Sequence, residues 1–234
     1  MSKRDLYIKA KAPCLYNTLP TKSGQTVSYA TGDDGDDQRA REVSFFILTN
    51  NNPFGNNTRF TGITGGYHQR SSNTFRDKDG VVTTKALAFP DNLMLDWAYY
   101  KGNENFGEVM MWYYDNALLQ PSTLRSWNGL LSYINTLSYT GFTNWKMPNQ
   151  LELSLVLFWG NNTIEFLNFE PFNVVNHLIW LNQTDPTNTA QAYRFGQSSF
   201  LFRVAMKNFE GAAVRLMCVR YSNYTVTGTG VIIS

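Results

Sequence analysis

The sequence contains very few of the residues that metal centres and nucleophilic sites use most. Its 234 residues include only 2 His and 2 Cys. Neither His68 nor His177 has a second His, Cys or Glu at the spacing that metal ligands need, and the chain lacks a glycine-rich phosphate loop and a nucleophile elbow. We therefore expect that the protein is not an enzyme and that it holds no metal and no cofactor. The alternative is a divergent hydrolase that uses a carboxylate pair such as Glu165 and Glu170.

The chain also lacks an excess of charge of one sign and any long hydrophobic run. It has 20 Lys and Arg against 18 Asp and Glu, scattered without a basic stripe that could neutralise a run of phosphates. We therefore expect no nucleic-acid partner. No apolar run reaches the roughly 18 residues of a membrane-spanning helix, and the N-terminus lacks the apolar segment of a secretory signal. We expect no membrane span and synthesis in the cytoplasm without export.

Two local features leave alternatives open. Cys14 and Cys218 lie near opposite ends of the chain, and without export two reduced, partly buried thiols are favoured over a disulfide bridge. The run Asp33, Asp34, Gly35, Asp36, Asp37 is acidic, but a calcium loop of the helix-loop-helix kind would need a glutamate at its twelfth position, which is Ser44 when Asp33 is counted as the first. We expect a solvated acidic turn there, with a bound cation as the alternative.

The residues that are abundant indicate a packed protein built from short strands and wide loops. Hydrophobic residues make up 43% of the chain and aromatic residues 15%, as in globular proteins, and its 24 Asn favour turns. Residues 1–20 are interpreted as an extended arm that docks on a neighbour, and residues 21–234 as one domain.

Apolar and aromatic runs predict strands, and polar, glycine-rich stretches predict the connections between them. Residues 50–73, rich in Asn, Gly and Ser, are predicted to be loop, and Asp79-Gly80 is predicted to be the turn of a hairpin. The predicted strands are residues 43–48, 92–97, 109–114, 164–172, 174–181, 200–206, 214–221 and 226–233.

Two helices are predicted in the middle of the chain. The first begins near residues 121–123, and its apolar residues recur at steps of three or four, at Leu124, Trp127, Leu131, Ile134 and Leu137. The second begins at Asn149, whose side chain can cap it while Glu152 reaches back to complete a capping box, and it ends near Gly160. The leucines of this second segment also alternate as in a strand, but the cap favours a helix.

Four blocks, taken in order along the chain, carry a resemblance to a known family. The first block is residues 26–36, in which residues 28–36 look like the family's opening segment. The second contains Thr74, Phe75, Asp77, Asp79, Gly80, Val82, Thr83, Leu93, Met94 and Trp97. The central and strongest block contains Trp127, Leu131, Tyr133, Asn135, Leu137, Gly141, Trp145, Lys146, Pro148, Asn149, Glu152 and Leu153. The last contains Val214, Arg215, Cys218, Val219 and Arg220. Together they resemble the lectin-like domains named after the Lcl C-terminal region, which have the C-type lectin-like fold in its formylglycine-generating-enzyme-like form.

The resemblance implies an α+β structure with the C-type lectin-like fold, in which two helices flank twisted antiparallel sheets with long loops. The family's Tyr-Trp-Ser-Ser-Thr segment corresponds here to residues 179–184, of different sequence. The resemblance places ligand-facing residues at Trp180, Asn182, Gln183, Thr184, Tyr193 and Arg203. Aromatic rings there could stack on a sugar or peptide while amides supply hydrogen bonds. The alternative is that Trp180 and Tyr193 belong to the core.

A lectin-like domain with an extended arm, no export signal and an Asn-rich, aromatic-rich composition is typical of a bacteriophage virion structural protein. We expect a head decoration, fibre or tail-tip component that forms a homo-oligomer and contacts other virion proteins. Its arm would dock on a neighbour by strand addition, and its loops would contact glycan or protein on the host surface. The alternative is a bacterial carbohydrate-binding or adhesion domain with no role in assembly.

Overall fold

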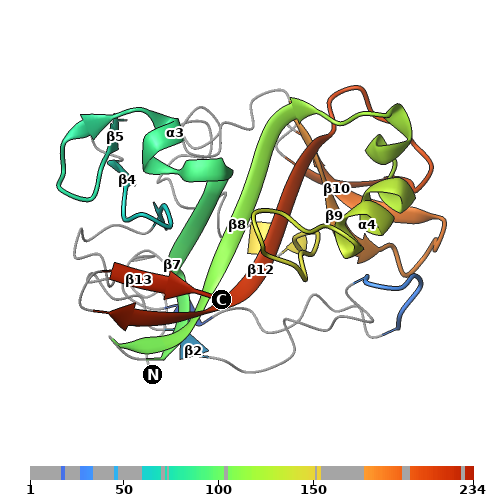
Figure 1. Cartoon of the computed structure of the whole chain (residues 1–234). Coiled ribbons are helices and arrows are strands. Elements are labelled where there is room, and N and C mark those ends of the chain that lie inside the picture. Colours follow the sequence, from blue (N-terminus) through green and yellow to red (C-terminus); the bar gives the residue numbers. More distant parts are fainter. Residues whose placement is uncertain are drawn as a thin grey trace, which may run out of the picture. The chain divides into compact units, whose positions relative to one another are not determined.

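Antiparallel sheet makes up most of the described part of the computed structural model, with few helices (Figure 1). The structure describes residues 17–18, 27–33, 45–46, 60–69, 72, 74–102, 105–150, 152–153, 177–196, 201–227 and 230–234. The chain forms two compact units: unit 1 contains residues 1–21, 43–111 and 221–234, and unit 2 contains residues 22–42 and 112–220. The α+β class is confirmed in a mainly-β form. The boundary between an arm at 1–20 and a domain at 21–234 stays a prediction.

A sheet of eight strands, in the order β13-β12-β8-β7-β3-β4-β5-β6, is the main feature of unit 1. Two of these strands, β8 and β12, continue into unit 2. The strands are β3 (Phe60–Thr61), β4 (Tyr67–Gln69), β5 (Thr74–Arg76), β6 (Val82–Thr83), β7 (Leu93–Gly102), β8 (Phe106–Leu118), β12 (Arg215–Thr227) and β13 (Gly230–Ile233). A separate antiparallel pair joins β1 (Asn17–Thr18) to β2 (Phe45–Phe46).

Trp97 on β7 is one of the large, fully buried side chains of unit 1. Its indole Nε1 donates a hydrogen bond to the Thr61 hydroxyl at 2.7 Å. The Tyr224 ring meets the indole edge-on, with ring centroids 5.4 Å apart, a geometry that aromatic pairs favour. These contacts join residues that are far apart in the sequence, and they position β3, β7 and β12 around one core.

Residues 50–73 are not all loop, so this prediction was wrong. They include β3 and β4, which pair with each other. The glycines that suggested a loop instead make a tight connection, in which Gly62 N–H donates to Gly66 O at 2.7 Å. This connection packs on Ala88 of helix α3 (Lys85–Ala88) so closely that a Cβ on Gly62 would lie 1.9 Å from the Ala88 carbonyl oxygen. Glycine is present here because backbone approaches backbone, and a pattern of hydrophobicity does not carry that signal.

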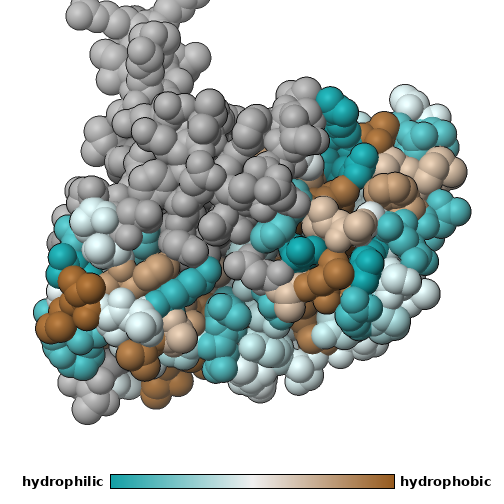
Figure 2. Space-filling model, turned by 90° about the horizontal axis from the view of Figure 1, so that it is seen from above, coloured by the Kyte–Doolittle hydropathy of each residue, from teal (hydrophilic) through white to brown (hydrophobic). Residues whose placement is uncertain are grey.

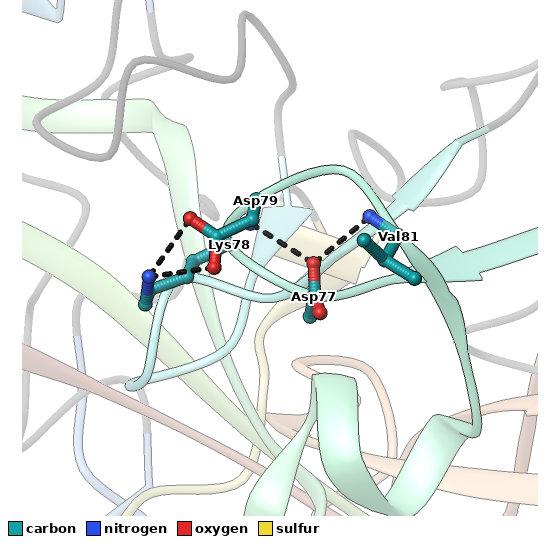
Figure 3. Close-up of polar contacts among 4 residues, drawn as sticks. All are labelled: Asp77, Lys78, Asp79 and Val81. Atoms are coloured by element: carbon teal, nitrogen blue, oxygen red, sulfur yellow. Dashed lines mark hydrogen bonds and ion pairs between the residues drawn. The ribbon is translucent and has the colours of Figure 1, made fainter.

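The hairpin predicted at Asp79-Gly80 is confirmed. It joins β5 to β6, and Figure 3 shows how the turn is held: Asp77 Oδ1 accepts from the backbone N–H groups of Asp79 and Val81, each at 2.9 Å. Gly80 has φ +84°, which suits glycine. The Lys78 ammonium pairs with the Asp79 carboxylate in solvent, so that pair adds little stability.

The first predicted helix is confirmed in unit 2, where it begins later than expected. Residues Ser122–Arg125 form a short 3-10 turn, η4, and helix α4 (Trp127–Asn135) follows it. Ser126 caps the helix by accepting from Gly129 N–H at 3.1 Å, as a serine at this position commonly does. Its buried face consists of Trp127, Leu130, Leu131 and Ile134.

The capping box predicted for the second helix is confirmed in both directions. Glu152 N–H donates to Asn149 Oδ1 at 2.8 Å, and Asn149 N–H donates to Glu152 Oε2 at 2.9 Å. Both residues are buried. The rest of this helix, its end near Gly160 and the strand predicted at 164–172 lie outside the described residues.

The remaining strand predictions are confirmed with shifted ends. β2, β7, β8, β11 (Leu201–Met206), β12 and β13 each overlap a predicted strand, and β9 (Leu178–Thr184) overlaps the one at 174–181. The sequence analysis missed β10 (Gln191–Gly196) and α3. Among the described residues there is no helix long and apolar enough to cross a membrane.

We predict that Gly62→Ala destabilises the protein by about 2–3 kcal/mol or more, because the new methyl group would collide with the Ala88 carbonyl. Urea denaturation of the two proteins measures the difference in the free energy of unfolding. Gly196→Ala on β10 is the control, because a Cβ there meets no atom within 4 Å, and it should stay within about 1 kcal/mol of wild type. Equal effects of the two substitutions would contradict the close packing on Ala88.

Candidate functional site

The six residues predicted to face a ligand all lie on one three-stranded sheet of unit 2. Its strand order is β11-β10-β9, with antiparallel pairing throughout, and β9 and β10 are labelled in Figure 1. Trp180, Asn182, Gln183 and Thr184 belong to β9, Tyr193 belongs to β10 and Arg203 belongs to β11. The fold therefore brings the whole predicted set together.

The tryptophan of this set is part of the core, which is the alternative that the sequence left open. Trp180 has 0% of its surface exposed. Its indole Nε1 donates to the Arg125 carbonyl oxygen at 2.8 Å, and this bond satisfies the one polar group of the side chain. Trp180 thus fixes β9 to the turn that precedes α4.

The polar residues at the end of β9 are also buried, where the pairing with β10 is irregular. The partner of Ala192 is Thr184 and the partner of Arg194 is Trp180, so β9 has more residues than β10 between these points. Gln183 Oε1 accepts from Gln150 N–H at 2.7 Å. Bulges of this kind redirect side chains, and here one side chain turns toward the capping segment of the second helix.

Asn182 differs from its neighbours on β9. Its backbone N–H donates to Pro148 O at 3.1 Å, but neither the nitrogen nor the oxygen of its buried side-chain amide forms a hydrogen bond in the described part of the chain. With Trp180, Gln183 and Thr184 it is enclosed within unit 2. These four side chains therefore cannot be reached by a ligand at the surface without a local change in structure.

The accessible part of the sheet is formed by β10, β11 and the segment that follows them. Arg203 is exposed and Tyr193 is half-buried. The structure adds Arg194, half-buried on β10, and Phe209, which has 44% of its surface exposed. The guanidinium of Arg194 lies over the Phe209 ring at 5.1 Å from its centroid, a cation–π geometry. The sequence analysis missed Arg194 because it did not recognise β10, although Tyr193 and Phe195 alternate as in a strand. Phe209 lies after β11, and its contact with Arg194 joins residues from different segments.

Exposed apolar side chains accompany these polar ones. Val204 and Met206 on β11 are among the exposed large hydrophobic residues of unit 2. Figure 2 shows that hydrophobic atoms on the face in view occur in small separate groups between hydrophilic ones. Single exposed apolar residues are normal, and these groups do not by themselves define a site.

A buried lysine packs against a tryptophan in the interior of unit 2. The Lys207 ammonium lies 4.2 Å from the centroid of the Trp127 ring. Burial lowers the pKa of Lys207, and the negative charge of Asp33 partly opposes that shift. The Asp33 carboxylate accepts from the backbone N–H groups of Tyr29 and Ala30 at 2.8 and 3.2 Å. Asp33 is buried rather than solvated, so the expected solvated turn was wrong for this residue; Asp34 to Asp37 lie outside the described residues.

The histidine and cysteine of unit 2 are packed into its structure. His177 Nδ1 lies 2.6 Å from the Tyr114 hydroxyl, and burial followed by the positive charge of Arg215 lowers the pKa of His177. Cys218 is buried and not in a disulfide, and burial raises the pKa of its thiol well above the usual value. A thiol in this state is a poor nucleophile. Cys14 lies outside the described residues.

No group of three or more His, Cys, Asp or Glu that could hold a metal ion occurs among the described residues. Comparison with models of known protein families found no match, and comparison with curated proteins found none either. Among the predicted residues and their neighbours, the accessible chemistry consists of two arginines, a tyrosine and a phenylalanine on the outer part of the β9–β10–β11 sheet. Such side chains bind by stacking and by donating hydrogen bonds.

We predict that Trp180→Ala lowers the free energy of unfolding by about 3–5 kcal/mol, because it leaves a cavity in the core and an unpaired carbonyl at Arg125. Arg203→Ala should change it by no more than about 0.5 kcal/mol, or raise it slightly, since Arg203 is exposed. Urea denaturation measures both. A Trp180→Ala protein as stable as wild type would contradict the structural role of this tryptophan.

Proposed function

We propose that the chain is a bacteriophage virion structural protein, a head decoration, fibre or tail-tip component, that displays a C-type lectin-like domain. We further propose that it attaches to glycan or protein on the host surface through the outer part of the β9–β10–β11 sheet. The observation that carries the proposal is that all six residues expected to face a ligand meet in this one sheet. Tyr193 and Arg203 are the two of them that are accessible.

The buried strand β9 supports the more accessible strands β10 and β11, and this arrangement favours binding over catalysis. All seven residues of β9 are buried, and the hydrogen bonds of Trp180 and Gln183 fix the strand to other parts of unit 2. Side chains on β10 and β11 are therefore held in place before a ligand arrives, which lowers the entropy lost on binding. Arg203 is paired with Arg194 and Tyr193 with Val204, so the Tyr193 ring and the Arg203 guanidinium project from opposite faces of the sheet. An accessible aromatic ring on such a base suits the apolar face of a saccharide, and a guanidinium suits its hydroxyl acceptors.

The end of the predicted arm supports anchoring to a neighbouring chain. Strand β1, residues 17 and 18, pairs with β2 through Asn17 with Phe46 and Thr18 with Phe45 in the described part of the chain. A two-stranded pair is at best marginally stable by itself, so its strands are suited to pairing with an edge on a neighbour. In this proposal the neighbour is a second copy of the chain or another virion protein.

We predict that deletion of residues 1–20 abolishes incorporation of the chain into phage particles, because the deletion removes β1 and the rest of the arm. Particles assembled in the presence of the wild-type or the truncated chain are purified and probed with an antibody against the chain. The control is Ser132→Ala, an exposed position on α4, which should be incorporated as wild type is. Normal incorporation of the truncated chain would contradict the anchoring role.

We predict saturable binding of the purified chain to at least one host glycan on an array, weakened about tenfold by Tyr193→Ala. Loss of an aromatic stacking contact of about 1.4 kcal/mol corresponds to that factor. Ser132→Ala is again the control, and circular dichroism checks that each variant is folded. Glycan binding together with failure to enter particles would favour a bacterial carbohydrate-binding or adhesion domain instead. No binding to any glycan would contradict attachment through saccharides.

A further inference from the structure

Two arginines lie directly opposite each other on the accessible part of the sheet. In the register of β10 with β11, Arg194 faces Arg203. Residues paired in this way project from the same face of an antiparallel sheet, with Cβ atoms about 5 Å apart, and like charges in such a pair destabilise it. The arrangement therefore needs an opposite charge to offset the repulsion.

The described part of the chain does not supply that charge. Arg194 contacts the Phe209 ring, and neither arginine forms an ion pair or a hydrogen bond through its guanidinium there. The pKa of Arg194 is lowered by burial and then by the charge of Arg203, but an arginine remains protonated at neutral pH. The sheet thus carries two adjacent positive charges that the described residues leave uncompensated.

The same face is open beside the pair. Gly196 lies two residues after Arg194, so a side chain added at Gly196 would project from the same face of the sheet as Arg194. A Cβ added there would meet no described atom within 4 Å. On the opposite flank, Trp180 is the partner of Arg194 on β9 and is fully buried. The face therefore changes from a closed apolar base at β9 to an open cationic edge at β11.

We propose that Arg194 and Arg203, with Phe209 beside them, form a binding site for an anionic saccharide that carries a carboxylate or a phosphate group. This inference rests on the proposed attachment to host glycan and names the class of glycan. The planar N–H groups of a guanidinium match the oxygens of a carboxylate or phosphate in pairs. An anion between the two arginines removes their repulsion, and the exposed part of the Phe209 ring offers an apolar surface to the sugar.

The test is binding of the full chain to an array of neutral, carboxylate-bearing and phosphorylated glycans of matched length. Wild type is compared with Arg203→Gln and Arg194→Gln, and the control is Lys78→Gln in the exposed turn of unit 1, which removes the same charge elsewhere. Both arginine variants should bind anionic glycans about tenfold more weakly or worse, as expected for a lost charge-assisted hydrogen bond. Binding of neutral glycans, and all binding by Lys78→Gln, should change less than twofold. The preference between carboxylate and phosphate identifies the anion.

The outcomes separate this site from the attachment function. Binding to neutral glycans without preference for anionic ones overturns the anion site and leaves attachment through saccharides standing, whereas no binding to any glycan overturns both the anion site and attachment through saccharides. The melting temperature of Arg203→Gln should equal or exceed that of wild type, because the substitution removes the repulsion. Arg203→Lys keeps the charge but loses the paired N–H groups, so it should bind the anionic glycan more weakly than wild type. Unchanged binding by both Arg203 variants overturns the proposal.

Discussion

Burial of β9 along its whole length is the constraint on which the rest of unit 2 depends. A strand enclosed on both faces must satisfy its polar groups inside the protein, because an unpaired buried group costs about 1–3 kcal/mol. Trp180 meets this demand through the Arg125 carbonyl, and Gln183 through the backbone of Gln150. The carbonyl of Leu181 accepts from the Trp127 indole at 2.7 Å. Each of these bonds attaches a different neighbouring segment to the same strand.

The capping box and the first helix are parts of the same arrangement. Because Asn149 and Glu152 satisfy each other, this helix N-terminus can be buried next to β9 without leaving those donors unpaired. α4 presents Trp127 to β9, and the Lys207 ammonium lies over that ring. This demand is not met everywhere, since the buried side-chain amide of Asn182 forms no hydrogen bond with the described residues.

The sequence predicted elements whose signal is local and failed where the cause is a contact between distant residues. The caps at Asn149 and the turn at Asp79-Gly80 depend on side chains within a few positions, so they were found. β3 and β4 were missed because the glycines between them are required by close packing on the backbone of Ala88, a residue more than 20 positions away in the sequence. The six residues expected to face a ligand lie on one sheet, but alternation of apolar residues does not say which strand of a sheet is central. For that reason the burial of β9, and the accessible pair Arg194 and Phe209, came only from the structure.

The buried lysine of unit 2 and the two arginines on its β9–β10–β11 sheet differ in the interactions that surround their charges. Inside, Lys207 has an aromatic ring for a neighbour and the carboxylate of Asp33 within electrostatic range. At the edge, Arg194 and Arg203 are opposed without a described counter-charge. A sequence selected for stability alone would replace one arginine of such a pair, because the repulsion is removed by a single substitution at an exposed position. Functional sites are among the places where proteins keep locally unfavourable arrangements. In the proposed site, stability and the binding of an anion therefore make opposite demands on this pair of arginines.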